Sequence, residues 1–272
     1  MNKIIKKRQL AENVIEYVIS APDIARTARA GQFVILITDE NGERVPFTIC
    51  DCDRTAGTVA LLVQTVGLTT AKLAKLKEGD YLFALVGPLG KPTDLSAAKE
   101  PVLVGGGIGI AVIHAQAKEL ALANRPFDVI IGARDASLLV YEEALASLAT
   151  NFFVMTDNGS KGGKGFVTDK LASLISGGKN YDTVFAVGPL MMMKAVSDLT
   201  KTLGIRTIIS MNSIMVDGTG MCGSCRLTVD GQTKYACVDG PEFDAHKVDF
   251  NEALIRSRFY SGEEQEAKCK IR

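Results

Sequence analysis

Apolar residues in the first hundred positions fall in short runs that alternate with turns. Segments 13–20 (NVIEYVIS), 32–38 (QFVILIT) and 57–66 (GTVALLVQTV) are rich in β-branched residues, and Gly, Asp and Asn turns separate them. Closely spaced runs of this kind are typical of short strands. We therefore expect a small β-barrel, with one short helix over residues 69–77.

From residue 99 the runs become continuously apolar, and each is joined to a helical segment. PVLVGGGIGIAVIHAQAKELALA reads as a strand, a glycine turn and a helix, and FDVIIGARD, NFFVMTDNG and YDTVFAVGP repeat the strand. Apolar strands that alternate with helices predict a parallel sheet covered on both faces. The run RTIISM, residues 206–211, would be its last strand.

A third, turn-rich segment begins near Asn212. It contains the paired runs CRLTVDG and QTKYACVDG and ends in a charged tail, residues 251–272. The pattern thus predicts three domains: a β-barrel over residues 1–98, an α/β domain over 99–211, and a C-terminal domain over 212–272.

Charge and targeting signals narrow the function classes. Thirty-one basic and 31 acidic side chains cancel, and no basic block stands out, which argues against a nucleic-acid binder. The N-terminus lacks a signal-peptide core, and glycines interrupt the longest apolar stretches, so we expect no membrane span. Six cysteines, three of them clustered, favour a metal site in a reducing, cytoplasmic compartment over a disulfide scaffold.

The clustered cysteines have the spacing Cys222-x2-Cys225-x11-Cys237. Plant-type [2Fe–2S] ferredoxins use C-x4-C-x2-C with a distant fourth cysteine. Asp217 stands where the first of those four cysteines would be, so the pattern predicts a cluster with one carboxylate ligand. The alternative is a zinc site made by three cysteines and the aspartate, which is unusual for structural zinc. Cys50 and Cys52 form no such set and read as structural.

Two glycine turns follow predicted strands of the α/β segment. Gly105, Gly106, Gly107 and Gly109 open a helix, where backbone amides can receive a phosphate or let a flat ring approach. The spacing misses the Rossmann GxGxxG, so a plain tight turn is an equal alternative. VGPLMMMKA repeats the arrangement, and its methionines alone would indicate core. His114 reads as packed in the helix, and His246 as a surface or loop residue.

Other motifs have a functional and a plain interpretation. Asp157 could bond the hydroxyls of an adenosine ribose and repel a 2′-phosphate, or simply form an Asx turn. In RVPFTI, Arg44 suits a phosphate, Phe47 could cover a ring and the Thr48 hydroxyl could meet a ring nitrogen. RVPFTI, VGLTT and GPLG could equally be a hairpin, a helix cap and a turn.

Taken together, the whole chain resembles the ferredoxin-reductase-like flavoproteins in its order of barrel, α/β domain and iron–sulfur segment. Its motifs are similar to those of the electron-transfer subunit of type B dihydroorotate dehydrogenase. SIMVDGTGMCGSC and ACVDGPEFDAHKVDF are closer to the small subunits of NADH-dependent reduced ferredoxin:NADP+ oxidoreductases, in which aspartate replaces the first cluster cysteine. The wider reductase family has Arg-x-Tyr-Ser, whereas here Arg44 lies one residue further from Thr48 and Phe47 replaces the tyrosine.

This resemblance implies an oxidoreductase subunit that binds FAD, a [2Fe–2S] cluster and NAD(H). Hydride would pass between NAD(H) and FAD, and single electrons would pass through the cluster to a larger flavoprotein subunit of an electron-bifurcating complex. No acid–base catalytic residue is required. The alternatives are the electron-transfer subunit of a dihydroorotate dehydrogenase and, from another class, a non-enzymatic zinc-stabilised binding module.

The implied site residues follow from the motifs. The expected metal ligands are Asp217, Cys222, Cys225 and Cys237. The expected cofactor-binding residues are Arg44, Pro46, Phe47, Thr48, Ile49, Val66, Gly67, Thr69, Thr70, Gly87, Pro88, Gly106, Gly107, Gly109, Asp157, Gly188, Pro189 and Met192.

Overall fold

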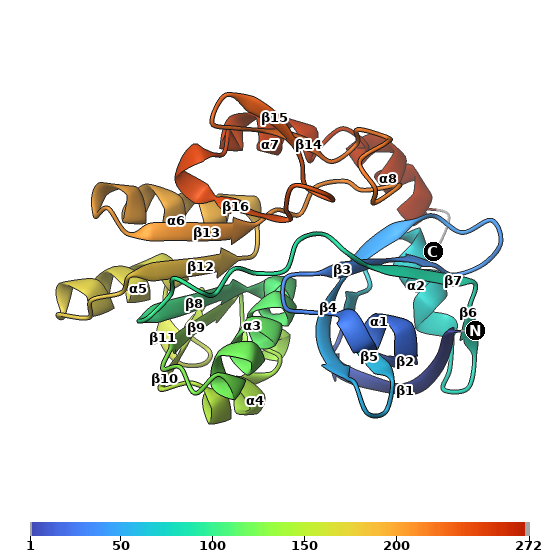
Figure 1. Ribbon diagram of the computed structural model, residues 1–272, viewed down its shortest axis with the longest axis horizontal. Coiled ribbons are helices and arrows are strands. Elements are labelled where there is room, and N and C mark those ends of the chain that lie inside the picture. The colour runs from blue at the N-terminus through green and yellow to red at the C-terminus, as the bar shows by residue number, and fades with distance from the viewer. Residues whose placement is uncertain (1, 270–272) are drawn as a thin grey trace.

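In the computed structural model, which describes residues 2–269, the N-terminal part is an antiparallel sheet with strand order β6-β1-β2-β5-β4-β3-β7 (Figure 1). A single residue, Phe83, separates β6 from β7, yet the two strands lie at opposite edges of the sheet. The sheet must therefore curl round on itself, as the predicted barrel does. Its strands are β1 (Asn2–Ala11), β2 (Val14–Ser20), β3 (Phe33–Ile37), β4 (Val45–Asp53), β5 (Thr58–Gln64), β6 (Tyr81–Leu82) and β7 (Ala84–Leu89).

The barrel interior is apolar, with Tyr17, Val34, Leu36 and Leu61 fully buried. The helices α1 (Pro22–Thr27) and α2 (Leu68–Lys75) contribute apolar side chains to this core, and the Tyr17 hydroxyl donates to the Leu73 carbonyl at 2.9 Å. Burial of this tyrosine raises its pKa to about 12, so it stays a neutral donor. The barrel and the helix α2 agree with the sequence pattern, whereas α1 was not expected.

The second sheet has the order β11-β10-β9-β8-β12-β13-β16, in which all neighbours are parallel except the last pair. Val102 and Val104 face one apolar cluster and Leu103 faces the other, as expected for a strand buried on both faces. The strands are β8 (Pro101–Gly106), β9 (Asp128–Ala133), β10 (Asn151–Thr156), β11 (Gly163–Lys164), β12 (Thr183–Val187), β13 (Arg206–Ser210) and β16 (Glu242–Asp244).

Helices cover both faces of this sheet (Figure 1). One face packs on α3 and α4, and the other on α5 and α6, through Leu145 on the first side and Leu171 on the second. The helical segments are η1 (Gly107–Gly109), α3 (Ile110–Leu122), η2 (Ala136–Leu138), α4 (Glu142–Leu148), α5 (Val167–Ser176) and α6 (Leu190–Thr202). The predicted α/β architecture is confirmed.

The C-terminal part lies over both preceding units (Figure 1). The hairpin β14 (Arg226–Val229) and β15 (Gln232–Tyr235) is followed by β16, which adds an antiparallel edge to the α/β sheet through Ser210 and Glu242. The chain ends in η3 (Ala245–Lys247), α7 (Phe250–Arg256) and α8 (Ser261–Cys269). Because β16 pairs with the α/β sheet, it holds the C-terminal part, including the cysteine loop, in a fixed position against the other two units.

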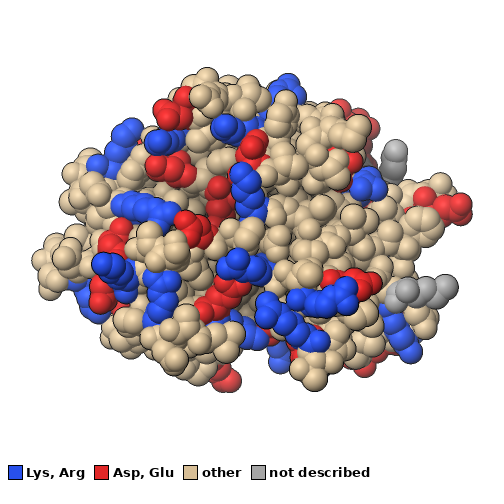
Figure 2. Space-filling model, viewed as in Figure 1, with Lys and Arg blue, Asp and Glu red and all other residues tan. Residues whose placement is uncertain are grey.

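The exterior has a mixed charge. In the face drawn in Figure 2, basic and acidic side chains are interspersed. None of the helices found in residues 2–269 is both long and apolar enough to cross a membrane.

Candidate functional site: a cysteine loop beside a barrel and two glycine turns

The β14–β15 hairpin brings two cysteines together. Ala236 N–H donates to the Cys225 carbonyl at 3.1 Å, and Cys237 N–H points at the Cys225 sulfur at 3.4 Å. The two sulfur atoms are 3.3 Å apart and both side chains are buried, with no disulfide between them. Two sulfurs this close, held by a hairpin, can serve one metal atom.

Cys222 is exposed, three residues before Cys225. Hydrogen bonds from Ser224, through its hydroxyl and its amide, lower the pKa of the Cys222 thiol to about 7, and the amides of Asp217 and Val216 act in the same direction. Because the thiolate is the form that binds metals, these donors prepare Cys222 as a ligand.

The loop can fold so tightly because Gly218, Gly220 and Gly223 all have positive φ, at 84°, 89° and 68°. Asp217, the predicted fourth ligand, is half-buried, and its Oδ2 accepts from the amides of Thr219 at 2.9 Å and Met221 at 3.3 Å. These bonds, those from Thr219 first, lower the pKa of Asp217. The carboxylate is thus ionised but turned into its own loop.

Within residues 2–269, no three His, Cys, Asp or Glu side chains converge in a way that would hold a metal ion. The donor chemistry nevertheless fits an iron–sulfur cluster: a close sulfur pair, a third thiol held by backbone amides, and a glycine-rich loop around them. For Asp217 to join the three cysteines as a ligand, its side chain has to rotate out of the turn.

RVPFTI lies in and just before β4, which forms an antiparallel hairpin with β3, in agreement with the plain interpretation of this motif. Phe47 and Thr48 pair with Val34 and Phe33 of β3 and are half-buried. The Arg44 guanidinium, which the sequence suggested for a phosphate, bonds the backbone of the cysteine loop: Nε donates to the Val216 carbonyl at 2.7 Å and Nη2 to that of Asp217 at 3.2 Å. The flavin motif and the cysteine loop are therefore in direct contact.

VGLTT forms the start of α2. The Thr70 hydroxyl oxygen accepts from the amides of Val66 and Gly67, both at 3.0 Å, and the Thr69 hydroxyl donates to the Glu43 carboxylate. Val66 remains 54% exposed. Gly87 and Pro88, joined by a cis peptide bond, lie within β7 beside Val34. The plain interpretation of VGLTT as a helix cap therefore holds, whereas GPLG continues strand β7 and does not form a turn at Gly87 and Pro88.

The two glycine turns that the sequence predicted lie side by side in the sheet. β8 and β12 are neighbours in the sheet, so Gly106 and Gly188 end adjacent strands. Met192 of α6 packs on both: a methyl group added at Gly106 would collide with its sulfur, and one at Gly188 would lie 2.7 Å from its Cε. Gly109 packs just as closely on the Val187 carbonyl, whereas Gly107, with φ +54°, has open space in front of it. These glycines let the turns after β8 and β12 pack closely together at the carboxyl ends of the strands, where open parallel sheets bind ligands.

Asp157 follows β10 on the same edge and is exposed. Its amide donates to the Ala133 carbonyl at 3.1 Å. Only β9 lies between β10 and β8, so Asp157 and the Gly106 turn are separated by roughly 10 Å across the sheet. An extended dinucleotide can span that separation.

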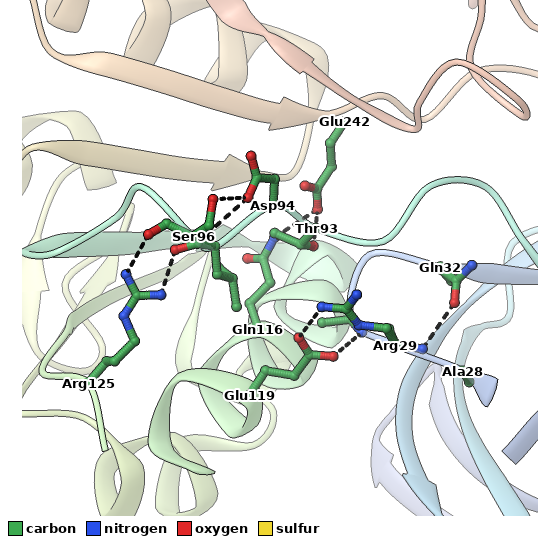
Figure 3. Close-up of polar contacts among 12 residues, drawn as sticks. Ala28, Arg29, Gln32, Thr93, Asp94, Ser96, Gln116, Glu119, Arg125 and Glu242 are labelled. Carbon is green, nitrogen blue, oxygen red and sulfur yellow. Dashed lines mark hydrogen bonds and ion pairs between the residues drawn. The ribbon is translucent and has the colours of Figure 1, made fainter. Parts of the chain in front are cut away.

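Sequence reasoning missed the junction shown in Figure 3. The partly buried Glu242 of β16 accepts from the Thr93 hydroxyl at 2.6 Å and the Gln116 amide at 2.9 Å, so it joins the β7–β8 connection to α3. Burial, with smaller contributions from the carboxylates of Glu119 and Asp94, raises the pKa of this carboxyl to about 7, although the two hydrogen bonds act in the opposite direction. Nothing in the local run PEFDAH signals that burial.

The histidines have supporting contacts. His114 is buried, stacks on Tyr141 with ring centroids 4.6 Å apart, and bonds the Cys50 carbonyl through Nδ1 at 3.0 Å. It is packed, as predicted. His246, expected at the surface, is partly buried instead, with Nε2 lying 3.0 Å from the Thr200 hydroxyl of α6. This contact helps to dock the C-terminal part on the α/β sheet.

Comparison with known proteins gives a consistent picture. Residues 212–249 match the family described as the iron-sulfur cluster binding domain of dihydroorotate dehydrogenase B. The chain is 42% identical to the dihydroorotate dehydrogenase B (NAD(+)) electron transfer subunit homolog of Thermotoga maritima, over 97% of this chain and 93% of that one. It is 33% identical to the electron transfer subunit of Listeria monocytogenes, over 90% and 97%.

Among solved structures, a chain of the NADH-dependent reduced ferredoxin-NADP oxidoreductase, described in connection with flavin-based electron bifurcation, matches with a TM-score of 0.94. That match has 40% identity and covers 100% of this chain and 98% of the other. Phthalate dioxygenase reductase matches with a TM-score of 0.62 and 20% identity, over 95% and 80%, which shows the shared fold alone.

Proposed function

The chain belongs to the family of dihydroorotate dehydrogenase B electron transfer subunits and their homologues, and we propose that it is the smaller flavin and iron–sulfur subunit of an NADH-dependent reduced ferredoxin–NADP oxidoreductase. The observation that carries this proposal is the end-to-end likeness to that oxidoreductase, together with a cysteine loop in which an aspartate holds the first ligand position. When bound, FAD exchanges hydride with NAD(H), and a [2Fe–2S] cluster passes single electrons.

For the flavin we propose a site along β4, the start of α2 and the Gly87–Pro88 part of β7. The half-buried β4 side chains and the exposed Val66 support it, because an isoalloxazine ring needs a flat apolar wall with a few polar contacts. Arg44 is not included in the flavin site, because its guanidinium bonds the backbone of the cysteine loop. The proposed residues are Pro46, Phe47, Thr48, Ile49, Val66, Gly67, Thr69, Thr70, Gly87 and Pro88.

For NAD(H) we propose the edge of the α/β sheet at the carboxyl ends of its strands. Met192 packs against the adjacent turns at Gly106 and Gly188, and Pro189 packs against the Gly106 turn. Gly107, which begins the helical turn with Gly109, has open space in front of it where a ring could lie against bare backbone. Asp157 would accept hydrogen bonds from the adenosine ribose hydroxyls.

For the cluster we propose the four ligands Asp217, Cys222, Cys225 and Cys237, with the last two on the same iron. The larger subunit would dock on the open side of this loop. Met221, next to Cys222, is 89% exposed, and a hollow of about 330 Å³ beside Cys222 is lined by Phe259 and Tyr260. An apolar surface beside a redox centre suits a partner protein. Thiolate ligands also suit a cytoplasmic location.

The second candidate, the electron-transfer subunit of a dihydroorotate dehydrogenase, is favoured by the names of the relatives. The activity of the purified native complex distinguishes the two candidate functions. Our proposal expects NADP+ reduction that requires both NADH and reduced ferredoxin. Dihydroorotate oxidation coupled to NAD+ would instead support the second candidate. A colourless protein that binds zinc in place of iron and flavin would contradict both.

A further inference from the structure

Arg44 joins two segments that are 172 residues apart. Its Nε and Nη2 donate to the carbonyl oxygens of Val216 and Asp217, at 2.7 Å and 3.2 Å. Arg44 directly precedes β4, which carries the flavin motif, while Asp217 opens the cysteine loop. The guanidinium thus fastens the backbone of one cofactor segment to that of the other.

The loop also lies tightly against the barrel at this point. A side chain at Gly218 would place its Cβ 2.8 Å from Cδ1 of Leu89 and 3.0 Å from Cγ1 of Ile35, so the loop backbone rests directly on β7 and β3. On the other side of the loop, Met221 is almost fully exposed. The cysteine loop therefore has one side fixed to the barrel and one open side, and Arg44 lies on the fixed side.

The fork geometry of arginine matters here. Two of its five N–H donors are used by the two successive carbonyls, and its charge is permanent near neutral pH. Lysine could supply the charge but not the planar two-point contact. A fixed positive charge next to the loop also stabilises any added negative charge within it, because charges at this range interact strongly at a partly buried site.

We propose that Arg44 is a positioning residue for the Asp217 end of the iron–sulfur cluster, and that its charge raises the reduction potential of that cluster. This inference rests on the proposed function, because it assumes that Asp217 and the three cysteines hold the cluster. It departs from the expectation that Arg44 binds the flavin phosphate. The flavin site would then depend little on this residue.

The test compares Arg44→Gln and Arg44→Lys with Arg26→Gln as a matched control. Arg26 lies on helix α1 of the barrel and bonds Asp23, and both side chains are exposed. Each purified holoprotein is measured for iron, sulfide and flavin content, for the cluster midpoint potential by EPR-monitored titration, and for hydrogen exchange of residues 216–221.

We expect Arg44→Gln to shift the potential to a more negative value and to speed exchange in the loop, with flavin content unchanged. Arg44→Lys should speed exchange similarly but shift the potential less, because it keeps the charge. Arg26→Gln should change neither. Loss of the cluster alone in Arg44→Gln would also support the inference.

Loss of flavin from Arg44→Gln, with an unchanged cluster potential and unchanged loop exchange, would overturn the inference and restore the phosphate role. If Arg44→Gln fails to fold, exchange and potential in Arg44→Lys decide, and wild-type values for both would overturn it. A wild-type protein without iron would instead refute the proposed function, so the two failures are distinguishable.

Discussion

The sulfur atoms of Cys225 and Cys237 lie 3.3 Å apart, because the β14–β15 hairpin returns the chain to its starting point. Their spacing in sequence, which is long for a local metal loop, becomes short in space once Gln232–Tyr235 pairs with Arg226–Val229. A hairpin thus supplies one half of a cluster site, and the glycine-rich loop supplies the other.

This pairing predicts that Cys225→Ser and Cys237→Ser each lose the cluster, because one iron loses a thiolate that no neighbour can replace. The measurement is iron and sulfide content per chain, with the visible spectrum of the oxidised protein. Cys52→Ser, at a half-buried barrel position, is the control and should keep full iron content. Retention of the cluster in both hairpin variants would show that it is bound elsewhere.

The carboxylate ligand makes a separate prediction. Asp217→Cys should retain a [2Fe–2S] cluster with a shifted potential and altered spectrum, because a thiolate is a softer, more electron-donating ligand than a carboxylate. The cysteine would also free the amides of Thr219 and Met221, which now bond the Asp217 carboxylate. Redox titration followed by EPR checks this. An unchanged spectrum and potential would mean that Asp217 is not a ligand.

Much of this arrangement could be predicted from the sequence, because the signals were local. Alternating runs predicted β2, β3 and β5, and continuous apolar runs predicted the parallel strands. Gly106 and Gly188 were expected to support each other, and β8 and β12 are adjacent. Each of these inferences needs only periodicity, turn chemistry and the rule that ligands bind at strand ends.

The rest depends on long-range contacts that no local pattern contains. Neither β1, with its mixed polar sequence, nor the antiparallel addition of β16 was foreseen. Arg44 seemed suited to a phosphate because its residue type suggests one, yet its partners are backbone carbonyls from a distant loop. The burial of Glu242 likewise arises only where three units meet.

Nucleotide choice follows from Asp157. A carboxylate that accepts from ribose hydroxyls would repel a 2′-phosphate, so we expect the catalytic efficiency with NADH to exceed that with NADPH by roughly tenfold or more. Steady-state dye reduction with both nucleotides measures it. Asp157→Ser should narrow the difference mainly by improving NADPH, while the neighbouring Asn158→Ser should leave it unchanged. Equal efficiencies in the wild type would refute this role for Asp157.

The C-terminal tail is expected to serve assembly. Ile255, Phe259 and Tyr260 are 64%, 55% and 54% exposed, and the Arg256 guanidinium lies 5.2 Å from the centre of the Phe259 ring. Exposed aromatic side chains near an arginine are typical of partner surfaces.

Deleting residues 259–272, of which 270–272 lie outside the described residues, should leave NADH oxidation by an artificial dye intact. The same deletion should weaken association with the larger subunit, as measured by co-purification. Loss of flavin or cluster on truncation would instead assign the tail to this chain's own core.

Glu242 predicts a pH dependence of stability. Its folded pKa of about 7 lies above the ordinary value of 4.5, so the folded protein holds a proton that the unfolded chain releases. The protonated carboxyl therefore contributes fully to the free energy of unfolding below about pH 4.5. This contribution is lost as the pH rises through 7, by up to about 3 kcal/mol.

Glu242→Gln keeps a neutral group of similar shape beside Thr93 and Gln116. The variant should therefore lose less stability than the wild type between pH 5 and 8, as followed by denaturant unfolding. Glu263→Gln, on the exposed helix α8, should follow the wild type, and parallel curves for wild type and Glu242→Gln would mean that this carboxyl is ionised throughout that range.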